Sequence, residues 1–314
     1  MNSKCLYCYQ NISEGGDFHE KCTEAFFGTK HAPLIPYSFN QMNELAKDVV
    51  DRSIAVPGVQ PKLSLSLIKE TVNKQQSCRL TVVGALGGNY ILKPPSNVYP
   101  QMPQNEHLTM RIAEAYGIKT VPSSLIHLQS GELAYLTKRI DRTSSGEKIH
   151  MLDMFQILEA VDKYKSSLEK IGKAIAIYSD NTLLDQLSFF ELCLFCFLTG
   201  NNDMHLKNFS MIHINNQWAL APAYDLLNVT LENPDDTEEL ALTLEGKKKK
   251  LNRAHFERLG LSLELNQKQI DSVFKRFEKN KKIANHWIQN SFMTQESKKR
   301  YRAILENNYS KTLK

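Results

Sequence analysis

The chain has 314 residues, of which 42% are hydrophobic and 23% are charged, and its formal net charge is +5 at pH 7. This composition excludes a disordered chain, and the length predicts two domains because an ordinary domain contains roughly 150 residues. A modest positive charge suits an anionic ligand but does not require nucleic acid.

The beginning of the chain, "MNSKCLYCYQ", lacks the apolar segment of a secretion signal. Six cysteines without such a signal point to a reducing compartment. We therefore expect a cytoplasmic protein, and export to a host would need a route that the sequence does not show. Residues 183–198 are the most apolar stretch, but they are too few for a membrane span and include Asp185 and Glu191, so we expect a buried helix and no membrane association.

The first half of the chain predicts mainly strands. Residues 1–50 are a mixed segment that we assign to the first lobe. Leucine and serine alternate over residues 63–67, which is typical of a half-buried strand. Residues 79–95 predict a hairpin with a Gly-Gly turn, residues 105–117 an amphipathic helix that ends at a glycine, and residues 131–141 a further strand.

The second half predicts mainly helices. Residues 151–161 and 181–200 have helical patterns, and the second is apolar on nearly every side, as expected for a core helix. Residues 210–225 predict a hairpin with an Asn-Asn turn, and the chain after residue 250 is again helical. We expect an α+β fold with a lead-in at residues 1–50, a strand-rich domain at 51–141 and a helical domain at 142–314.

The loop "LTGNNDMHLKNF" follows the most apolar helix and concentrates polar groups. Asp203 and Asn208 form the pattern D-x-x-x-x-N, the spacing at which a kinase catalytic loop places its base and a metal-binding amide. A carboxylate can accept a hydroxyl proton, and an amide oxygen binds Mg²⁺ without adding a repelling charge. Kinase chemistry also needs a short hairpin and a later metal-binding aspartate, and Asp225 follows the hairpin.

The other parts of a kinase site occur in the required order upstream. They are Gly58 in a loop before a strand, Lys93 at the end of a later strand, and Glu106 in a helix. Each alone has an ordinary structural explanation: a turn glycine, a solvated lysine, and a first-turn glutamate favoured by the helix dipole. Their joint order favours phosphoryl transfer.

Several segments resemble the HipA family of bacterial toxin serine/threonine kinases, over roughly residues 50 to 285. These segments are "VPGVQPKLSL", "YILKPP", "NEHLTMRIA", "GNNDMHLKNFSMI" and "LAPAYDLLN". The length is similar to the short HipT type, in which a small separate protein, HipS, supplies an N-terminal subdomain beside a DNA-binding antitoxin of HipB type. The resemblance implies a two-lobed protein-kinase-like fold that uses ATP and Mg²⁺.

The same resemblance implies a function and partners. The protein would phosphorylate an aminoacyl-tRNA synthetase, with the tryptophanyl enzyme expected, and would thereby arrest growth. It would contact DNA only indirectly, through the antitoxin. It would also phosphorylate itself near the phosphate loop, at Ser53.

The resemblance also assigns roles to residues. Asp203 matches the catalytic base, and Asn208 and Asp225 match the metal ligands. The implied ATP-binding residues are Pro57, Gly58, Val59, Gln60, Pro61, Lys62, Lys93, Lys138, Arg139, Ile140, His205, Lys207, Asn208, Tyr224 and Asp225.

The sequence departs from the family pattern at two places. Leu152 replaces a glutamate that the family often has, so Asp153 and Gln156, like Glu106, receive only a supporting role. Ala55 replaces a serine that some members place directly before the phosphate loop, which leaves Ser53 as the site of self-phosphorylation.

Three clusters lie outside this pattern. Cys5-x-x-Cys8 and His19-x-x-Cys22 have the residue types and spacings of a zinc knuckle, but reduced thiols and a surface histidine are also compatible with the sequence. Cys193 and Cys196 lie within the apolar helix and predict buried free thiols. The run 247–250, "KKKK", predicts a solvated loop, with contact to DNA phosphates as the alternative.

Three other functions remain open at this point. The first is a small-molecule phosphotransferase, which would share the Asp-to-Asn loop. The second is metal-dependent hydrolysis through Asp203-x-His205, which needs further ligands at close spacing. The third is an inactive kinase that acts only as a binding partner, against which the complete set of kinase residues argues.

Overall fold

The computed structural model describes residues 4–13, 15–52, 62–72, 75–83, 87–143 and 145–313. Within this part the chain forms two compact units: unit 1 contains residues 1–107 and 121–148, and unit 2 contains residues 108–120 and 149–314. The domain boundaries at residues 50 and 141 stay a prediction. Ser53 and the loop residues Pro57 to Pro61 lie outside the described residues.

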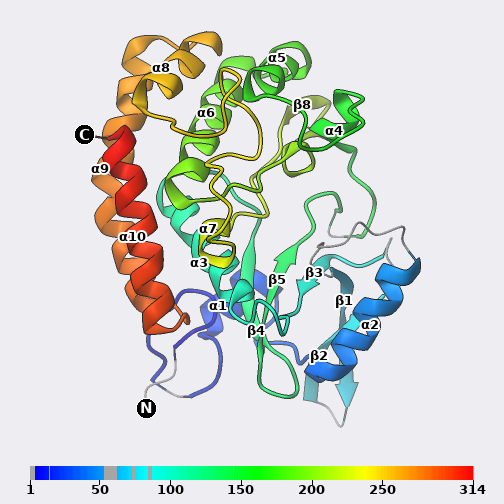
Figure 1. The fold of residues 1–314 in the computed structure, drawn as a ribbon. Helices are drawn as coiled ribbons and strands as arrows, with labels where there is room; N and C mark the ends of the chain where they lie inside the picture. The colour runs from blue at the N-terminus through cyan, green and yellow to red at the C-terminus, as the bar shows by residue number, and fades with distance from the viewer. Residues whose placement is uncertain are drawn as a thin grey trace. The chain divides into compact units, whose positions relative to one another are not determined.

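Unit 1 is built on a five-stranded antiparallel sheet with the order β2-β1-β3-β5-β4. Helices α1 and α2 belong to this unit, and α2 runs along the sheet (Figure 1). The elements are α1 (Glu20–Phe27), α2 (Phe39–Arg52), β1 (Leu63–Val72), β2 (Gln75–Val82), β3 (Tyr90–Lys93), β4 (Ser123–His127) and β5 (Leu133–Lys138).

The core of unit 1 lies between these helices and the sheet. Alternation places Leu63 and Leu65 on one face of β1, and both are buried. They belong to one hydrophobic cluster with Phe26 of α1 and Met42 of α2, which are completely buried. The leucine–serine alternation therefore correctly predicts a strand with one buried face.

The predicted hairpin over residues 79–95 is wrong. Strands β2 and β3 do not pair with each other, because β1 lies between them and pairs with both. Directly before β3, the N–H of Asn89 donates to the Leu65 carbonyl of β1 at 3.0 Å. Gly88 has φ +76°, and a Cβ there would lie 2.4 Å from the same carbonyl oxygen, so this close approach requires glycine.

Helix α3 (Met102–Ala115) confirms the predicted amphipathic helix and begins three residues before the expected start. Residues up to His107 belong to unit 1, and those from Leu108 belong to unit 2. Gly117 has φ +85° and its N–H donates to the Glu114 carbonyl, as expected for a glycine that ends a helix.

Unit 2 is mainly helical and includes a small three-stranded antiparallel sheet with the order β6-β7-β8. Its long helices α9 and α10 lie side by side (Figure 1). Its elements are β6 (Met151–Asp153), α4 (Met154–Ile157), α5 (Leu168–Tyr178), α6 (Thr182–Thr199), η1 (Leu206–Asn208), β7 (Ser210–Ile214), β8 (Gln217–Leu220), α7 (Val229–Glu232), α8 (Arg253–Ser262), α9 (Gln267–Asn290) and α10 (Gln295–Thr312).

The predicted helix over residues 151–161 is only partly correct. Residues 151–153 form strand β6, which pairs with β7, and the helix that follows has only four residues. Asp153 caps this helix: its carboxylate accepts from the N–H of Gln156, and the Gln156 side chain accepts from the N–H of Asp153. This capping box starts a helix at residue 154 and is incompatible with one that begins earlier.

The hairpin over residues 210–225 is confirmed as β7 and β8. Asn215 and Asn216 both have positive φ values, 53° and 59°, which a two-residue turn between twisted strands requires.

Helix α6 is the central helix of unit 2. Within the described residues it is the only helix that is long and apolar enough to cross a membrane, and 72% of it is buried inside the structure, which is typical of a core helix. Cys193 and Cys196 are each 1% exposed, and burial raises the pKa of both thiols. They are structural thiols, as predicted.

Candidate active site

The loop with the candidate catalytic residues starts where α6 ends. Gly200 has φ +70°, and a Cβ there would lie 3.0 Å from the Thr230 hydroxyl and 3.1 Å from the Asn228 amide oxygen. The Gly200 carbonyl accepts from both the N–H and the hydroxyl of Thr230, at 3.0 and 3.1 Å. A rigid helix and a second anchored segment therefore fix the start of this loop.

Asp203 is partly exposed, and its carboxylate accepts a hydrogen bond of 2.8 Å from the hydroxyl of Tyr164. Burial and the neighbouring Asp203 raise the pKa of Tyr164, so this hydroxyl stays protonated and acts as a donor at neutral pH. A single donor on one carboxylate oxygen orients the group while lone pairs remain for a substrate hydroxyl.

Asn208 ends the short helix η1 and is held by the same loop. Its N–H donates to the His205 carbonyl at 2.9 Å, and its side-chain amide donates to the Asp203 carbonyl at 3.2 Å. Because the amide nitrogen donates inward, the orientation of the side chain is fixed and its oxygen is the atom left to act as a ligand.

His205 is close enough to the carboxylates of Asp203 and Asp225 to feel the charge of both. It is 7% exposed, and its Nδ1 has no hydrogen-bond partner among the described residues. Burial lowers the pKa of His205, although the carboxylates of Asp203 and Asp225 act in the opposite direction. We conclude that a neutral imidazole stands near both acidic groups, with one buried nitrogen available to a ligand.

Asp225 follows the β7–β8 hairpin and has φ +61°, in the left-handed region. This conformation is uncommon for residues other than glycine, asparagine and aspartate, and it concentrates at functional sites. The Asn201 side chain donates to the Asp225 carbonyl at 3.5 Å, which links this residue to the loop after α6.

Lys207 and Tyr224 are in contact through a hydrogen bond. The Tyr224 hydroxyl donates to the Lys207 carbonyl at 2.9 Å and also bonds the Ser210 hydroxyl at 2.6 Å. The Lys207 ammonium lies over the Phe155 ring, 4.7 Å from its centre, and its side chain is exposed. Asp153 pairs with Ser210 between β6 and β7.

In unit 1, Lys93 and Glu106 form an ion pair of 2.6 Å, as kinase logic predicts. Lys93 is 4% exposed and Glu106 1%, so both charges are buried. Lys93 also lies over the Tyr135 ring, 5.4 Å from its centre. The sequence predicts a solvated lysine at the end of a strand as the ordinary alternative, and the structure excludes it.

The segment Lys138 to Ile140, predicted to meet adenine, begins at the last residue of β5. The N–H of Lys138 donates to the Pro122 carbonyl at 2.9 Å, and that of Arg139 donates to the Asn89 carbonyl at 2.8 Å. The Arg139 guanidinium forms two bonds to Asp141, of 2.9 and 2.6 Å. Two of the three backbone donors are therefore engaged within unit 1.

Lys62 is the one residue of the predicted phosphate loop within the described part of the chain, and its side chain is exposed.

The predicted site residues that the structure brings together fall into two groups. One group is in unit 2 and contains Asp203, His205, Lys207, Asn208, Tyr224 and Asp225. The other is the pair of Lys93 and Glu106 in unit 1.

Sequence reasoning missed Tyr164. It lies 39 residues before Asp203 in an irregular segment, and no spacing rule points to it. The Leu206 N–H donates to the Lys163 carbonyl at 3.2 Å, so this segment packs on the loop through the backbone as well.

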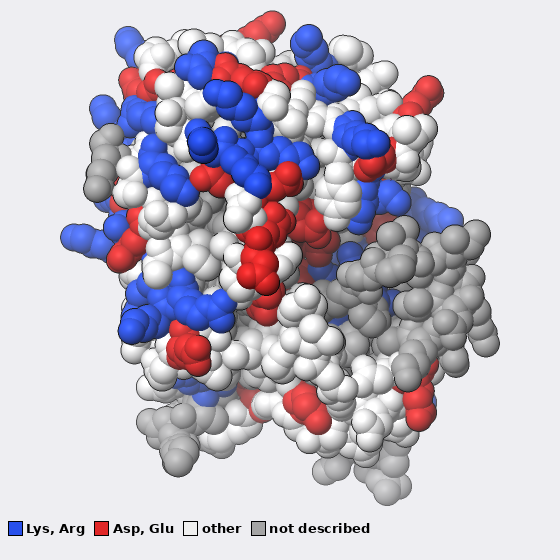
Figure 2. All heavy atoms as spheres, in the orientation of Figure 1, with Lys and Arg blue, Asp and Glu red and all other residues white. Residues whose placement is uncertain are grey.

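The lysine run 247–250 pairs with the acidic loop before it. Lys248 forms an ion pair of 3.1 Å with Glu238, and Lys249 donates to the Thr237 hydroxyl. Figure 2 shows a group of Lys and Arg side chains in its upper part with Asp and Glu side chains beside it. These contacts favour the solvated-loop interpretation of the run.

The structure also bears on the hydrolase alternative. Within the described residues, the only group of three or more histidine, cysteine, aspartate or glutamate side chains close enough to share a metal ion is Cys5, Cys8, His19 and Cys22. Asp203 and His205 do not belong to such a group, so metal-dependent hydrolysis at this loop has no support.

The fold is protein-kinase-like and of the α+β class, as two solved structures show. HipA of Shewanella oneidensis, solved in complex with HipB and operator DNA, matches 95% of this chain and 79% of its own with a TM-score of 0.66 and 19% identity. The proinflammatory kinase CtkA of Helicobacter pylori matches 80% of this chain and 93% of its own with a TM-score of 0.52 and 17% identity.

Residues 54–287 match the family described as the HipA-like C-terminal domain, and the chain belongs to this family. A putative kinase of Haemophilus influenzae is 32% identical over 215 residues, which are 63% of this chain and 59% of that protein. The serine/threonine-protein kinase toxin HipA of Shewanella oneidensis is 26% identical over 213 residues, which are 61% of this chain and 47% of that protein. The chain thus spans about half the length of the curated relatives it matches.

Proposed function

We propose that this protein is an ATP-dependent serine/threonine-protein kinase that acts as the toxin of a toxin–antitoxin system. The observation that supports this most directly is that the loop after α6 holds Asp203 and Asn208 together, through the bond from the Asn208 side chain to the Asp203 carbonyl, and is linked to Asp225 through Asn201. Membership of the HipA-like family agrees with it.

In the proposed reaction, a serine or threonine hydroxyl oxygen attacks the γ-phosphorus of ATP, and the bond to the oxygen that ADP retains breaks. The hydroxyl proton passes to the Asp203 carboxylate. Tyr164 holds this carboxylate in position through its hydrogen bond to one oxygen. The other lone pairs of the carboxylate remain for the proton in transfer.

The residues present fit a divalent metal. The Asn208 amide oxygen and the Asp225 carboxylate are hard oxygen ligands of the kind that Mg²⁺ prefers, and the inward hydrogen bond of the Asn208 nitrogen leaves that oxygen as the ligand atom. When bound, Mg²⁺ neutralises charge on the phosphates. Asp225 and Asn208 hold and orient it.

We assign ATP binding in unit 1 to Lys93, to Lys62 and the loop before it, and to the backbone of residues 138–140. Glu106 holds the Lys93 ammonium by their 2.6 Å pair, which fixes the lysine for a charge-assisted contact to phosphate. Because the N–H groups of Lys138 and Arg139 are engaged, we assign the backbone N–H donor to adenine to Ile140.

The test is to label a bacterial lysate with the γ-phosphate of ATP in the presence of the purified protein. We expect one or a few labelled proteins that disappear with Asp203→Asn. Labelling of small molecules alone would instead favour a small-molecule phosphotransferase, and no labelling with well-folded protein would contradict a kinase.

We further propose the short HipT type, with an aminoacyl-tRNA synthetase as substrate and the tryptophanyl enzyme as first candidate. An antitoxin of HipB type and a small HipS-type protein would be its partners, and DNA would be contacted only through the antitoxin. HipA of Shewanella oneidensis in complex with HipB and operator DNA is the precedent for such a partner. The cytoplasm is where these partners and the substrate would be met.

Asp225→Asn should raise the Mg²⁺ concentration needed for half-maximal activity by about tenfold or more, because one ligand charge on the metal is lost. The measurement is phosphoryl transfer as a function of Mg²⁺ at saturating ATP. Unchanged Mg²⁺ dependence at normal rate would remove Asp225 from the metal site.

Ser53 should become phosphorylated when the active protein is incubated with Mg-ATP, and mass spectrometry of the loop peptide measures this. A phosphoserine adds a charge of about −1.5 to −2 beside the groups that must hold ATP phosphates, so we expect the modified protein to bind ATP less well. Ser53→Ala should prevent both effects, and Asp203→Asn should remain unmodified. An unmodified loop in protein that phosphorylates its substrate would contradict this assignment.

A further inference from the structure

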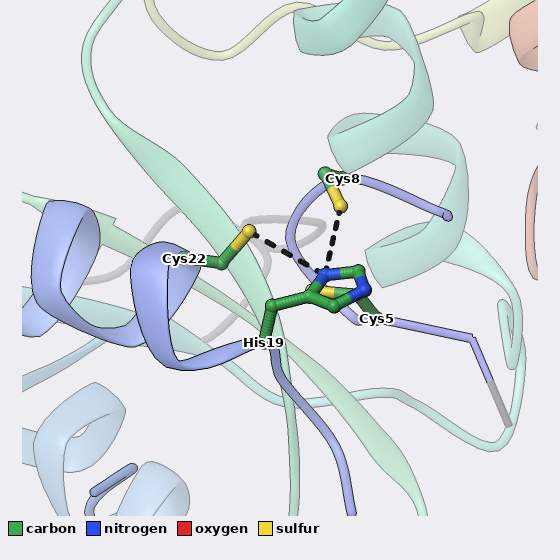
Figure 3. Close-up of side chains that lie close together, drawn as sticks. All are labelled: Cys5, Cys8, His19 and Cys22. Carbon is green, nitrogen blue, oxygen red and sulfur yellow. Dashed lines mark hydrogen bonds between the residues drawn. The ribbon is translucent and has the colours of Figure 1, made fainter. Parts of the chain in front are cut away.

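Four side chains outside the kinase site converge at the start of the chain. The ligand atoms of Cys5, Cys8, His19 and Cys22 all lie within 4.8 Å of one another. Figure 3 shows the three sulfur atoms around the imidazole ring of His19. Cys5 is completely buried and Cys22 is 5% exposed, whereas Cys8 and His19 are partly exposed, so the cluster lies at the edge of the interior.

Two sulfur–nitrogen distances in this cluster are close to the one that tetrahedral zinc requires. With Zn–S bonds of about 2.3 Å and Zn–N bonds of about 2.0–2.1 Å, tetrahedral angles separate a sulfur and a nitrogen ligand by about 3.5–3.6 Å. The Nδ1 atom of His19 lies 3.4 Å from the Cys8 sulfur and 3.8 Å from the Cys22 sulfur.

The other imidazole nitrogen fixes the tautomer. His19 Nε2 lies 3.1 Å from the backbone carbonyl oxygen of Asn11, which can only accept a hydrogen bond, so Nε2 has the proton. Nδ1 is then unprotonated and points at the sulfur atoms. A backbone carbonyl that holds the far nitrogen of a metal-binding histidine is the usual outer partner of a zinc site.

The backbone holds the four residues in place in two short segments. A tight turn brings Cys5 and Cys8 together: the Cys5 N–H donates to the Gln10 carbonyl and the Tyr9 N–H to the Cys5 carbonyl, both at 2.9 Å. His19 directly precedes α1, and the Cys22 N–H donates to its carbonyl at 2.9 Å within the first turn. His19 and Cys22 therefore lie on the same side of the first turn of α1.

We propose that Cys5, Cys8, His19 and Cys22 bind one Zn²⁺ ion in a closed, structural site. Binding would convert the three thiols to thiolates and release their protons, while His19 would bind as neutral imidazole. Four protein ligands leave no open position for a water molecule, so the site stabilises structure and has no catalytic role.

The site would fasten the beginning of the chain to helix α3. Tyr9, next to Cys8, donates to or accepts from His107 Nδ1 through its hydroxyl at 2.9 Å, and His107 is completely buried. His107 is adjacent to Glu106, the partner of Lys93. Loss of zinc should therefore loosen the helix that holds this ion pair, within unit 1.

The first experiment measures the metal content of the full chain, purified without a histidine tag from cells grown with zinc. We expect one zinc per chain for the wild type, and less than about a tenth of that for Cys22→Ser, because an incomplete closed site loses most of its affinity. Cys78→Ser is the matched control, since Cys78 is a half-buried free thiol outside the cluster, and it should keep one zinc. His19→Cys replaces one zinc ligand by another and so keeps four ligands, and this variant should also keep one zinc per chain.

A second experiment uses the wild type alone, so that it does not depend on the folding of a variant. Replacement of zinc by Co²⁺ should give the visible absorption of a tetrahedral site with sulfur ligands, and a strong chelator should lower the melting temperature. Wild-type protein with no bound zinc, or a zinc content that Cys22→Ser leaves unchanged, would overturn the proposal. These readouts are independent of kinase activity, so the two proposals can fail separately.

Discussion

Asp203→Asn should lower the rate of phosphoryl transfer by about 10²–10⁴-fold, the usual contribution of a positioned general base. The amide has nearly the shape of the carboxylate but cannot accept the hydroxyl proton. Because the Asp203 side chain is partly exposed and an amide can still accept the hydrogen bond from Tyr164, the melting temperature should change little. Growth arrest on expression should disappear together with phosphorylation of the substrate.

The matched control for this experiment is Asp271→Asn. It also removes one carboxylate from unit 2, at a side chain that is 40% exposed and pairs with Arg253 at 3.3 Å in the helical part of that unit. It should leave both transfer and growth arrest unchanged. Undiminished growth arrest by Asp203→Asn would count decisively against a kinase mechanism.

Lys93→Met should abolish use of ATP and also destabilise the protein by about 3–5 kcal/mol, because it removes the cation that pairs with the buried Glu106 carboxylate. A stability loss of this size is not expected for an exposed lysine. It is expected here because the side chains of Lys93 and Glu106 are only 5% and 1% exposed. Chemical unfolding gives the free energy of unfolding, and ATP binding is measured separately.

The double variant Lys93→Met/Glu106→Gln separates the two roles. It removes both charges from the interior, so we expect it to regain most of the stability that the single variant loses. ATP use should stay absent because the cation that meets the phosphates is still missing. A double variant that regains both stability and turnover would show that Lys93 has only a structural role.

The candidate site could be predicted from the sequence where its residues are close along the chain. Asp203 and Asn208 lie in one loop, and the Asn215-Asn216 turn that leads to Asp225 is specified by its own backbone conformation. These features depend on local geometry, which a spacing rule captures. The same reasoning predicts the central helix α6, because an apolar segment of this length in a globular protein usually forms a buried helix.

The features that escaped prediction depend on contacts that are distant in sequence. Strand β1 separates β2 from β3, and nothing in residues 79–95 indicates an intervening partner. Tyr164 reaches Asp203 only through the packing of an irregular segment. The burial of Lys93 follows from its partner in α3, whereas its own sequence context, directly before two prolines, is equally typical of an exposed position.

The strand order of unit 1 has a consequence for the newly made chain. In the sheet, β3 pairs with β5, and β5 pairs with β4. Both β4 and β5 follow helix α3 in the sequence, whereas β3 precedes it. When only the chain through Lys93 has emerged from the ribosome, one edge of β3 is still unpaired. An unpaired strand edge can form hydrogen bonds with other chains. Because long-range pairing of this kind forms slowly, the exposed edge should persist until residue 138 has emerged, and aggregation during synthesis should depend on this interval.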